Sequence, residues 1–259
     1  MEFETLGDRC KFYEVREAGK ALLLGAPVLA RLDGRAFHSF TRGLQRPYDE
    51  RLSKAMIETA SHLVEKNNAA IGYTQSDEIT LAWFPSADNP DSMNFSGRVQ
   101  KLCSILAAQA SVFFYATIQA AIPEKAGKLL EFDCRVWNVP DAREVYLNLL
   151  WREQDATKNS ITMAASAHYS HKQLHGKSGG DKQEMLFQKG INWNDYPAFF
   201  KRGTYVKRQK ILRTLSEAEL ARIPEKHRPT EPIVRSTASV MDWAPISTMA
   251  PEAVFDLAA

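Results

Sequence analysis

The sequence predicts an α+β fold, with helices packed on one face of an antiparallel sheet. One observation is the order of the expected elements within the first 140 residues: strand, helix, strand hairpin, long helix, strand. Another is composition, because 44% hydrophobic and 25% charged residues in a chain of 259 are ordinary for a soluble protein with a sizeable core. Together they exclude disorder of the chain as a whole.

The first expected strand and helix are separated by a short polar stretch. Residues 26–32 have the apolar pattern of a buried strand, which ends at Asp33 and Gly34. Asp49 is a predicted N-cap for a helix through about Lys66. The apolar residues of that segment recur at helical spacing: Leu52, Met56, Leu63 and Val64.

A strand hairpin and a long helix follow. Residues 69–84 predict two strands around a polar tip at residues 75–78. A long helix is expected from about residue 95 to residue 121, with its apolar side chains clustered in the middle. Residues 132–139 predict a further strand, ended by Pro140.

The second half of the chain is less regular. We expect helices at about 142–153 and 159–173, a loop at 175–180, short strands and turns at 183–210, and one helix near 216–222. The resulting domain prediction is a catalytic core over 1–140, an extension over 141–210 that completes the catalytic domain, and a loosely packed C-terminal appendage over 211–259.

Cellular location follows from what the sequence lacks. No apolar run reaches the roughly 18 residues that span a bilayer, and the N-terminus has no signal-peptide pattern, so we expect a cytoplasmic protein without membrane association. The three cysteines, Cys10, Cys103 and Cys134, are far apart, which argues against a disulfide framework or a zinc site. We expect them to be reduced and mostly in the core.

Positive charge is concentrated in one segment. The formal net charge is only +2, but residues 200–215 contain six basic residues and no acidic one: Lys201, Arg202, Lys207, Arg208, Lys210 and Arg213. Such a strip can neutralise nucleic-acid phosphates. The alternative is an ordinary solvated surface.

Two acidic residues form the strongest candidate for a chemical site. Asp33 lies where a buried strand meets a glycine, and Asp77 lies at the tip of the strand hairpin. Carboxylates at adjacent strand ends can converge on hard cations such as Mg²⁺, and two are the minimum for a two-metal site. Glu78 is expected to point to the opposite side of its strand from Asp77. The alternative is that these residues are a turn and a solvated hairpin tip.

Longer motifs resemble a known family. Residues 31–40 (Arg-Leu-Asp-Gly-Arg-Ala-Phe-His-Ser-Phe) and 72–78 (Gly-Tyr-Thr-Gln-Ser-Asp-Glu) resemble the two signature blocks of the tRNA(His) guanylyltransferase family. Further blocks match in the same order at 46–49, 132–136, 151–155, 181–187, 191–194 and 201–204. The resemblance covers roughly residues 5–210.

The resemblance implies a palm-like catalytic domain of ferredoxin-like topology and a set of site residues. Two Mg²⁺ ions are bound by Asp33, Asp77 and the carbonyl of Gly34, and Glu78 is a further catalytic candidate. Nucleotide-binding candidates are Asp33, Gly34, Arg35, Ala36, Phe37, His38, Arg46, Asp49, Ser76, Asp77, Arg98, Lys101, Lys182 and Asn192. RNA-binding candidates are Arg152, Asn159, His168, His171, Lys201, Arg202, Lys207 and Arg208. The alternative for Arg98 and Lys101 is that they lie on an ordinary solvated helix face. The alternatives for His168 and His171 are plain packing or, together with His175, ligation of a transition metal.

The same resemblance implies a reaction at the 5′ end of tRNA, with growth in the 3′–5′ direction. ATP activates a 5′-monophosphate, and the 3′-hydroxyl of GTP or another nucleoside triphosphate then attacks and releases AMP. Such phosphoryl transfers depend on metals and cationic groups more than on a protein nucleophile. The family also implies a homotetramer, arranged as a dimer of dimers.

One motif departs from the family pattern. Members dedicated to tRNA(His) carry His-Ile-Asn-Asn where this chain has Thr157, Lys158, Asn159 and Ser160. The chain is more similar to the guanylyltransferase-like branch, which repairs truncated tRNA 5′ ends by pairing with the opposite strand. A nucleotidyl cyclase and a non-catalytic tRNA-binding module remain as alternatives.

Overall fold

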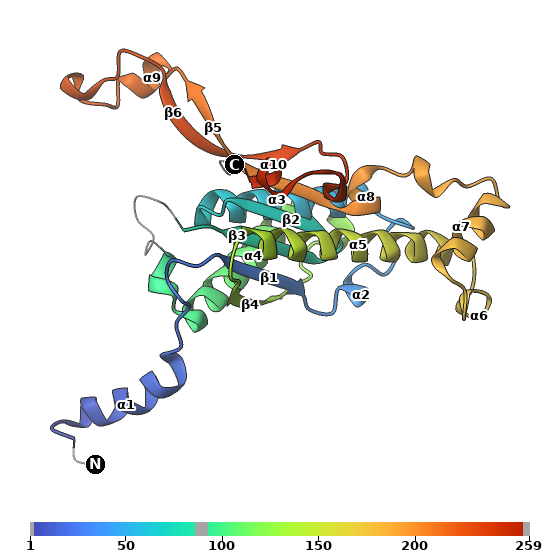
Figure 1. Cartoon of the computed structure of the whole chain (residues 1–259), viewed down its shortest axis with the longest axis horizontal. Helices are drawn as coiled ribbons and strands as arrows, with labels where there is room; N and C mark the ends of the chain where they lie inside the picture. Colours follow the sequence, from blue (N-terminus) through green and yellow to red (C-terminus); the bar gives the residue numbers. More distant parts are fainter. Residues whose placement is uncertain (1–2, 86–92, 256–259) are drawn as a thin grey trace.

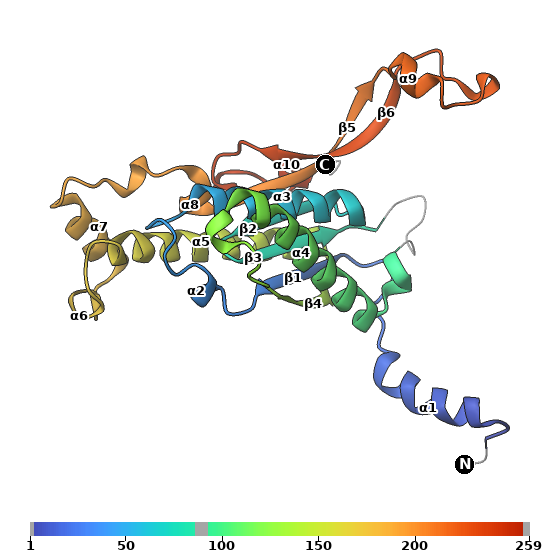
Figure 2. The same cartoon turned by 180° about the vertical axis from the view of Figure 1, so that it is seen from behind.

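A six-stranded antiparallel sheet forms the centre of the molecule in the computed structural model, which describes residues 3–85 and 93–255 (Figures 1 and 2). Its order is β4-β1-β3-β2-β5-β6, from β1 (Val28–Gly34), β2 (Ile71–Gln75), β3 (Glu78–Trp83), β4 (Phe132–Asn138), β5 (Thr204–Arg213) and β6 (Ile233–Met241). Every neighbouring pair is antiparallel. The first four strands have ferredoxin-like topology, with the short helix α2 (Phe37–Phe40) and a long helix after β1 and another long helix after β3, so the predicted α+β fold is confirmed.

One face of the sheet is covered by α3 (Glu50–Asn67) and α4 (Val99–Ala121). As predicted, Asp49 caps α3, since its carboxylate accepts the N–H of Arg51 at 3.1 Å. A short 3-10 turn, η1 (Asn94–Gly97), precedes α4, which therefore begins later than the sequence suggested. Leu63 of α3 and Phe114 of α4 are fully buried against this face.

The second face is also covered, by α5 (Ala142–Ser166), so the expectation of helices on one face is incomplete (Figure 1). Val145 and Leu149 pack there against Leu29 and Tyr73. We expected two helices with a break after residue 153, but α5 is continuous. No glycine or proline interrupts it, and Glu153, Ala156 and Ser160 are buried through the expected break.

The C-terminal part adds strands to the sheet and returns to its α5 face. The distal parts of β5 and β6 project from the body as a two-stranded arm, which carries α9 (Glu217–Leu220) and η4 (Glu225–His227) at its tip (Figure 1). The predicted helix near 216–222 is confirmed, but β6 was not predicted, and the boundary predicted at residue 211 lies inside β5. Beyond β6, η5 (Ile246–Thr248) and α10 (Pro251–Phe255) pack against α5.

A small hydrophobic core, separate from the cores on the two faces of the sheet, surrounds the C-terminal end of α5. It contains α6 (His171–Leu174), α7 (Gly179–Phe187), η3 (Trp193–Asp195) and α8 (Ala198–Arg202). The prediction of short strands from residue 183 was wrong here. Ser178 and Asp181 form a capping box that starts α7, a local signal that the sequence contains.

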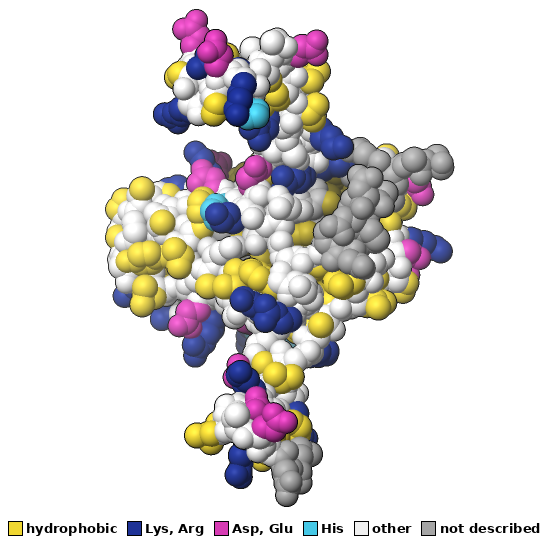
Figure 3. Space-filling model, turned by 90° about the vertical axis from the view of Figure 1, so that its left-hand side faces the viewer, with side chains coloured by type: hydrophobic (Ala, Val, Ile, Leu, Met, Phe, Trp, Pro, Cys, Tyr) yellow, Lys and Arg dark blue, Asp and Glu magenta, His cyan; other side chains and the backbone are white. Residues whose placement is uncertain are grey.

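Helix α1 (Leu6–Ala18) was not predicted, and none of its residues is buried. The space-filling view shows the arm and α1 as separate lobes above and below the body, with hydrophobic side chains gathered on the body between them (Figure 3). Cys10 is exposed in α1, contrary to expectation, while Cys103 and Cys134 are partly buried and all three are free thiols.

One helix, α4, is long and apolar enough to cross a membrane by length and composition alone. This is weak evidence, because core helices pass the same test. In this chain Leu102, Leu106 and Ile118 of α4 pack into the hydrophobic core against the sheet.

Candidate active site

The structure brings Asp33 and Asp77 together at one end of the sheet. Asp33 lies near the end of β1, and Asp77 lies in the two-residue turn between β2 and β3. The N–H of Gly34 donates a hydrogen bond to the carbonyl oxygen of Asp77 at 3.0 Å, which ties the two segments together. Ser76 adopts the left-handed conformation with φ of 55°, which tightens the turn. The predicted pair therefore lies at a single site.

Gly34 is required at this site by close packing. A Cβ atom on Gly34 would lie 2.1 Å from the Cδ2 atom of Phe37 and 3.2 Å from the Cβ atom of Asp77. The Phe37 ring is buried in the core against Phe114 and Phe132. Only glycine lets the backbone beside Asp33 approach both neighbours.

The electrostatics of the pair favour a bound cation. Burial raises the pKa of Asp77, and the nearby negative charge of Asp33 raises it further. Within residues 3–85 and 93–255, no lysine, arginine or histidine forms an ion pair with either carboxylate. Oxygen ligands and unbalanced negative charge fit a hard divalent ion such as Mg²⁺. Across the same residues, no cluster of three or more His, Cys, Asp or Glu could hold a metal, so the remaining ligands would be backbone, water or substrate oxygens.

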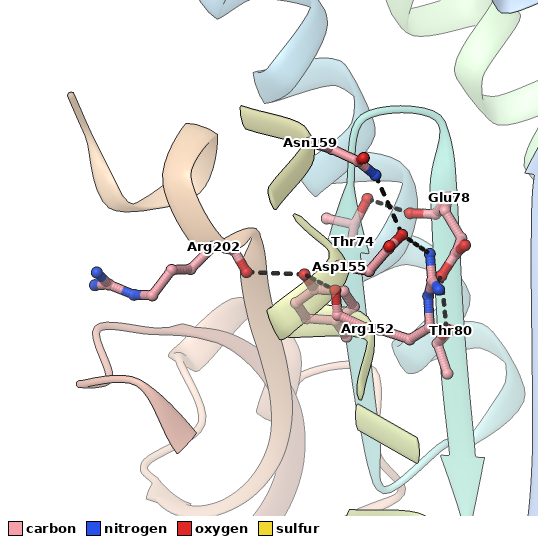
Figure 4. Close-up of polar contacts among 8 residues, drawn as sticks. Thr74, Glu78, Thr80, Arg152, Asp155, Asn159 and Arg202 are labelled. Carbon is pink, nitrogen blue, oxygen red and sulfur yellow. Dashed lines mark hydrogen bonds and ion pairs between the residues drawn. The ribbon is translucent and has the colours of Figure 1, made fainter. Parts of the chain in front are cut away.

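Glu78 is engaged elsewhere, as Figure 4 shows. Its carboxylate accepts a hydrogen bond from Nε of Arg152 at 2.7 Å, and the two side chains are only 15% and 14% exposed. Burial raises the pKa of Glu78, while the hydrogen bond and charge of Arg152 lower it. In this conformation Glu78 is an ion-pair partner, and Arg152, predicted to bind RNA, is directed into the protein.

A cavity of about 590 Å³ is lined by Asp77 but not by Asp33. Six predicted nucleotide-binding residues line it: Phe37, His38, Arg46, Asp49, Ser76 and Asp77. The sequence analysis missed other lining residues, among them Arg42, Tyr48, Met163, Ser166 and Phe199. Arg42 and Tyr48 could have been found from their closeness to the matched block at 46–49. Met163 and Ser166 reach the cavity from α5 and had no local signal.

Asp49 and Arg35 have internal partners. Asp49 is 4% exposed, and the hydrogen bonds from Arg51 lower its pKa, so it remains ionised. Arg51 also pairs with Glu124 at 2.6 Å, which fixes the start of α3. Arg35 forms an exposed ion pair with Glu131 at 2.7 Å, and Ala36 follows it in the left-handed conformation.

Arg98 and Lys101 lie at the opposite end of the sheet from Asp33. Arg98 forms a β-bridge with Ala21, before β1 begins, whereas Asp33 is near the end of β1. That strand alone separates the two ends by roughly 20 Å. Within one chain, the structure does not bring these two cations to the aspartates.

Lys182 and Asn192 belong to the small core and do not line the cavity. The Nζ atom of Lys182 donates to Thr162 Oγ1 at 3.1 Å, and Thr162 is next to Met163 in the cavity wall. Asn192 caps η3 by accepting the N–H of Asn194 at 3.0 Å. Their predicted role in binding a nucleotide stays a prediction.

The RNA-binding candidates divide by accessibility. Lys207 is 6% exposed and lies over the ring of Trp243, and its contact with RNA stays a prediction. Arg208 donates to Ser236 Oγ at 2.6 Å inside the arm. The side chain of Arg202 points away from the Glu78–Arg152 pair (Figure 4).

The remaining RNA-binding candidates lie on or near the small core. Asn159, His168 and His171 are exposed. Asn159 donates to Asp155 at 3.1 Å, and Lys201 donates to the carbonyl of Asn194 while lying over the ring of Trp193. Their contact with RNA stays a prediction.

Comparison with known proteins agrees with this arrangement. A tRNA(His) guanylyltransferase from Saccharomyces cerevisiae is 29% identical over 219 residues, which cover 77% of this chain and 90% of that protein. The structure of a bacterial tRNA(His) guanylyltransferase-like protein in complex with ATP is 32% identical, covers 98% of both chains and has a TM-score of 0.78. A GTP complex of a bacterial protein of the same description is 30% identical, covers 94% of both chains and has a TM-score of 0.72.

The family model described as tRNAHis guanylyltransferase matches residues 7–140, which include β1, the β2–β3 turn and both aspartates. That match covers more than half of the chain, and the similarity to the bacterial structures extends over nearly all of it. The chain therefore belongs to the tRNAHis guanylyltransferase family.

Proposed function

We propose that this chain, a nucleotidyltransferase by its family, adds nucleotides to the 5′ end of tRNA in the 3′–5′ direction. The observation that carries the proposal is the convergence of Asp33 and Asp77, of which Asp77 lines a cavity together with Phe37, His38 and Arg46. The cavity volume of about 590 Å³ lies within the range of small-molecule sites. ATP and GTP are the proposed substrates, because solved relatives are complexes with these nucleotides.

The residues of the site have separable roles. When two Mg²⁺ ions are bound by Asp33, Asp77 and the Gly34 carbonyl, they supply charge neutralisation at the triphosphate and lower the pKa of the attacking hydroxyl. Arg46, in the cavity wall, places a cationic group where phosphates would lie. Ser76 and Phe37 shape the wall next to Asp77. Asp49, held by Arg51, fixes the end of the loop at the start of α3.

We further propose that the substrate is a tRNA with a truncated 5′ end, repaired against the opposite strand. The support is that the segment from Thr157 to Ser160, in the middle of α5, keeps only Asn159 of the family's His-Ile-Asn-Asn. Lys158 and Asn159 are exposed there, whereas Ser160 is buried and accepts a hydrogen bond from Nε1 of Trp193 at 3.2 Å. The motif therefore presents Lys158 and Asn159 to solvent, whereas Ser160 packs inside the protein.

The test compares two 5′-monophosphorylated tRNAs with purified protein, ATP, Mg²⁺ and all four labelled nucleoside triphosphates. One is a full-length tRNA(His) awaiting its additional guanosine, and the other lacks its first acceptor-stem nucleotide. Faster addition to the truncated tRNA, with the added base set by the opposing strand, is the expected result. Preferred guanosine addition to tRNA(His), whatever base lies opposite, would overturn the repair assignment.

The same assay separates the alternatives. A cyclic nucleotide product formed without RNA would identify a nucleotidyl cyclase. Tight tRNA binding without turnover would identify a binding module.

We also propose a cytoplasmic homotetramer. Its support is that Arg98 and Lys101 lie far from the aspartates of their own chain and that α1 has no buried residue, as would suit surfaces used between subunits.

A further inference from the structure

Two carboxylates flank Asp33 across the sheet, and an arginine pairs with each. Glu78 on β3 and Asp133 on β4 are the register partners of Asp33. Direct partners on antiparallel strands point to the same face, with Cβ atoms about 5 Å apart. Arg152 pairs with Glu78 at 2.7 Å, and Arg135 pairs with Asp133 at 3.1 Å. Of the acidic groups at this end of the sheet, Asp33 and Asp77 are therefore left for a cation.

The two ion pairs differ in burial. The side chains of Arg135 and Asp133 are 53% and 60% exposed, so water screens that pair. Arg152 and Glu78 are 14% and 15% exposed. Removing one partner of a shielded pair leaves a charge without compensation. Without Arg152, Glu78 would keep only the longer-range charge of Arg31, and a divalent ion held by its register partner Asp33 would lie close to its carboxylate.

Arg152 is held in place by its own helix and by the neighbouring strand (Figure 4). One of its terminal nitrogens donates to Asp155 Oδ2 at 3.1 Å, and the same oxygen accepts from Asn159 at 3.1 Å. The hydroxyl of Tyr73 lies 3.5 Å from the Arg152 carbonyl and donates to the Arg202 carbonyl at 2.8 Å. The guanidinium is thus held between Asp155 and Glu78, and Tyr73 contacts the backbone of Arg152.

We propose that Arg152 is a positioning residue that keeps Glu78 out of the metal site, so that Asp33 and Asp77 alone supply its carboxylate ligands. The inference rests on the proposed function, because it concerns the same site. It also gives a role to a residue of α5 that does not line the cavity and whose ion pairs are with Glu78 and Asp155. The pair connects the metal site to Asn159, which lies in the segment of α5 that departs from the family pattern.

The test is Mn²⁺ binding by isothermal titration calorimetry, without nucleotide or tRNA. Arg152→Gln should bind Mn²⁺ roughly three- to tenfold more tightly than wild type, because Glu78 joins the site. Glu78→Gln and the double variant Glu78→Gln/Arg152→Gln should stay within about twofold of wild type, because neither has a third carboxylate. Arg213→Gln, which breaks an exposed pair with Glu219 on the arm, is the matched control and should be unchanged.

Weaker or unchanged Mn²⁺ binding in Arg152→Gln would overturn the proposal, and so would weaker binding in Glu78→Gln, which would make Glu78 a ligand. If Arg152→Gln does not fold, Arg152→Met, which keeps the apolar stem of the side chain, takes its place with the same expected result. Asp33→Asn tests the proposed function separately. Mn²⁺ binding that survives Asp33→Asn would reject the metal site itself, whatever Arg152 does.

Discussion

At the scale of single residues, the ionised carboxylate of Asp77 suits a bound cation but destabilises the protein when no metal is present. Burial and the charge of Asp33 both raise the pKa of Asp77, so the folded protein holds a proton there more tightly than the unfolded chain. Without metal, this carboxylate destabilises the fold as the pH rises from its unfolded pKa near 4 through the raised folded value. A divalent cation between the two aspartates would offset that effect.

Asp77→Asn should therefore raise the melting temperature of the metal-free protein at neutral pH and lower nucleotide addition by at least about a hundredfold. Scanning calorimetry in EDTA and in Mg²⁺ measures the first effect, and Mg²⁺ should stabilise wild type but not the variant. An Asp77→Asn protein that keeps full activity would reject the assignment of this carboxylate to the metal.

Gly34→Ala should lower the free energy of unfolding by about 1–3 kcal/mol, because the added methyl overlaps the Phe37 ring and the core must shift. Urea unfolding measures this effect. Gly179→Ala is the control, because a Cβ atom there meets nothing within 4 Å and the residue does not need a positive φ. Equal destabilisation of the two variants would mean that packing against Phe37 is not the cause.

Some residues of the site could be predicted from the sequence, and others could not. Asp33, Gly34 and Asp77 could be predicted because each occupies a strand end that local sequence marks. The pairing of Glu78 with Arg152 could not, since it joins residues 74 positions apart and depends on how α5 lies across the sheet. The burial of Lys207 was missed for the same reason. It lies over Trp243, which belongs to the returning C-terminal segment.

At the scale of elements, α5 organises much of the second half of the chain. Its Glu153 is 4% exposed and accepts the N–H of Ile246 at 3.2 Å. The hydroxyl of Tyr146 donates to the Ile246 carbonyl at 2.9 Å. One helix thus covers the sheet and also holds the segment that follows β6. Burial raises the pKa of Glu153, and the hydrogen bond from Ile246 partly opposes the shift.

Glu153→Gln should change how stability depends on pH. The folded protein binds a proton at Glu153 more tightly than the unfolded chain, so wild type gains stability as the pH falls through the raised pKa towards about 4.3. The variant is neutral throughout, so its stability relative to wild type should be greatest at neutral pH and decline in acid. Urea unfolding at about pH 7 and pH 5 measures this trend, and exposed Glu144→Gln on the same helix is the control.

Elements with strong local signals were predictable. The Asp49 cap and the helical spacing that follows it predicted α3, and the polar tip predicted the β2–β3 hairpin. Strand β6 was missed because its hydrogen-bond partners in β5 are supplied from 20 or more residues away and its side chains are only partly buried. Such a strand has little alternation between apolar and polar residues for a sequence to show.

At the scale of the whole molecule, the body carries two projections with different attachments. The arm continues two strands of the central sheet, whereas α1 buries no residue. Isolated helices of this length are marginal in water, so α1 adds little to the stability of a single chain. The segment after β6 is different, because Ile246 and Val254 are fully buried.

Deleting residues 1–19 should therefore change the free energy of unfolding of the dilute monomer by less than about 1 kcal/mol, whereas deleting residues 243–259 should cost several times as much. Urea unfolding of both truncated chains measures the contrast. A large loss on removing residues 1–19 would show that α1 packs on the body in solution.

The exposed tip of the arm also affects what happens when trypsin cuts the chain. Its tip carries exposed trypsin sites such as Arg222 and Lys226, far from the paired ends of β5 and β6 near Tyr205 and Met241. A cut there opens the covalent chain but leaves both strands in the sheet and Ile246 in the core. Limited trypsin digestion should thus yield a nicked protein whose two fragments separate in denaturant and migrate together without it.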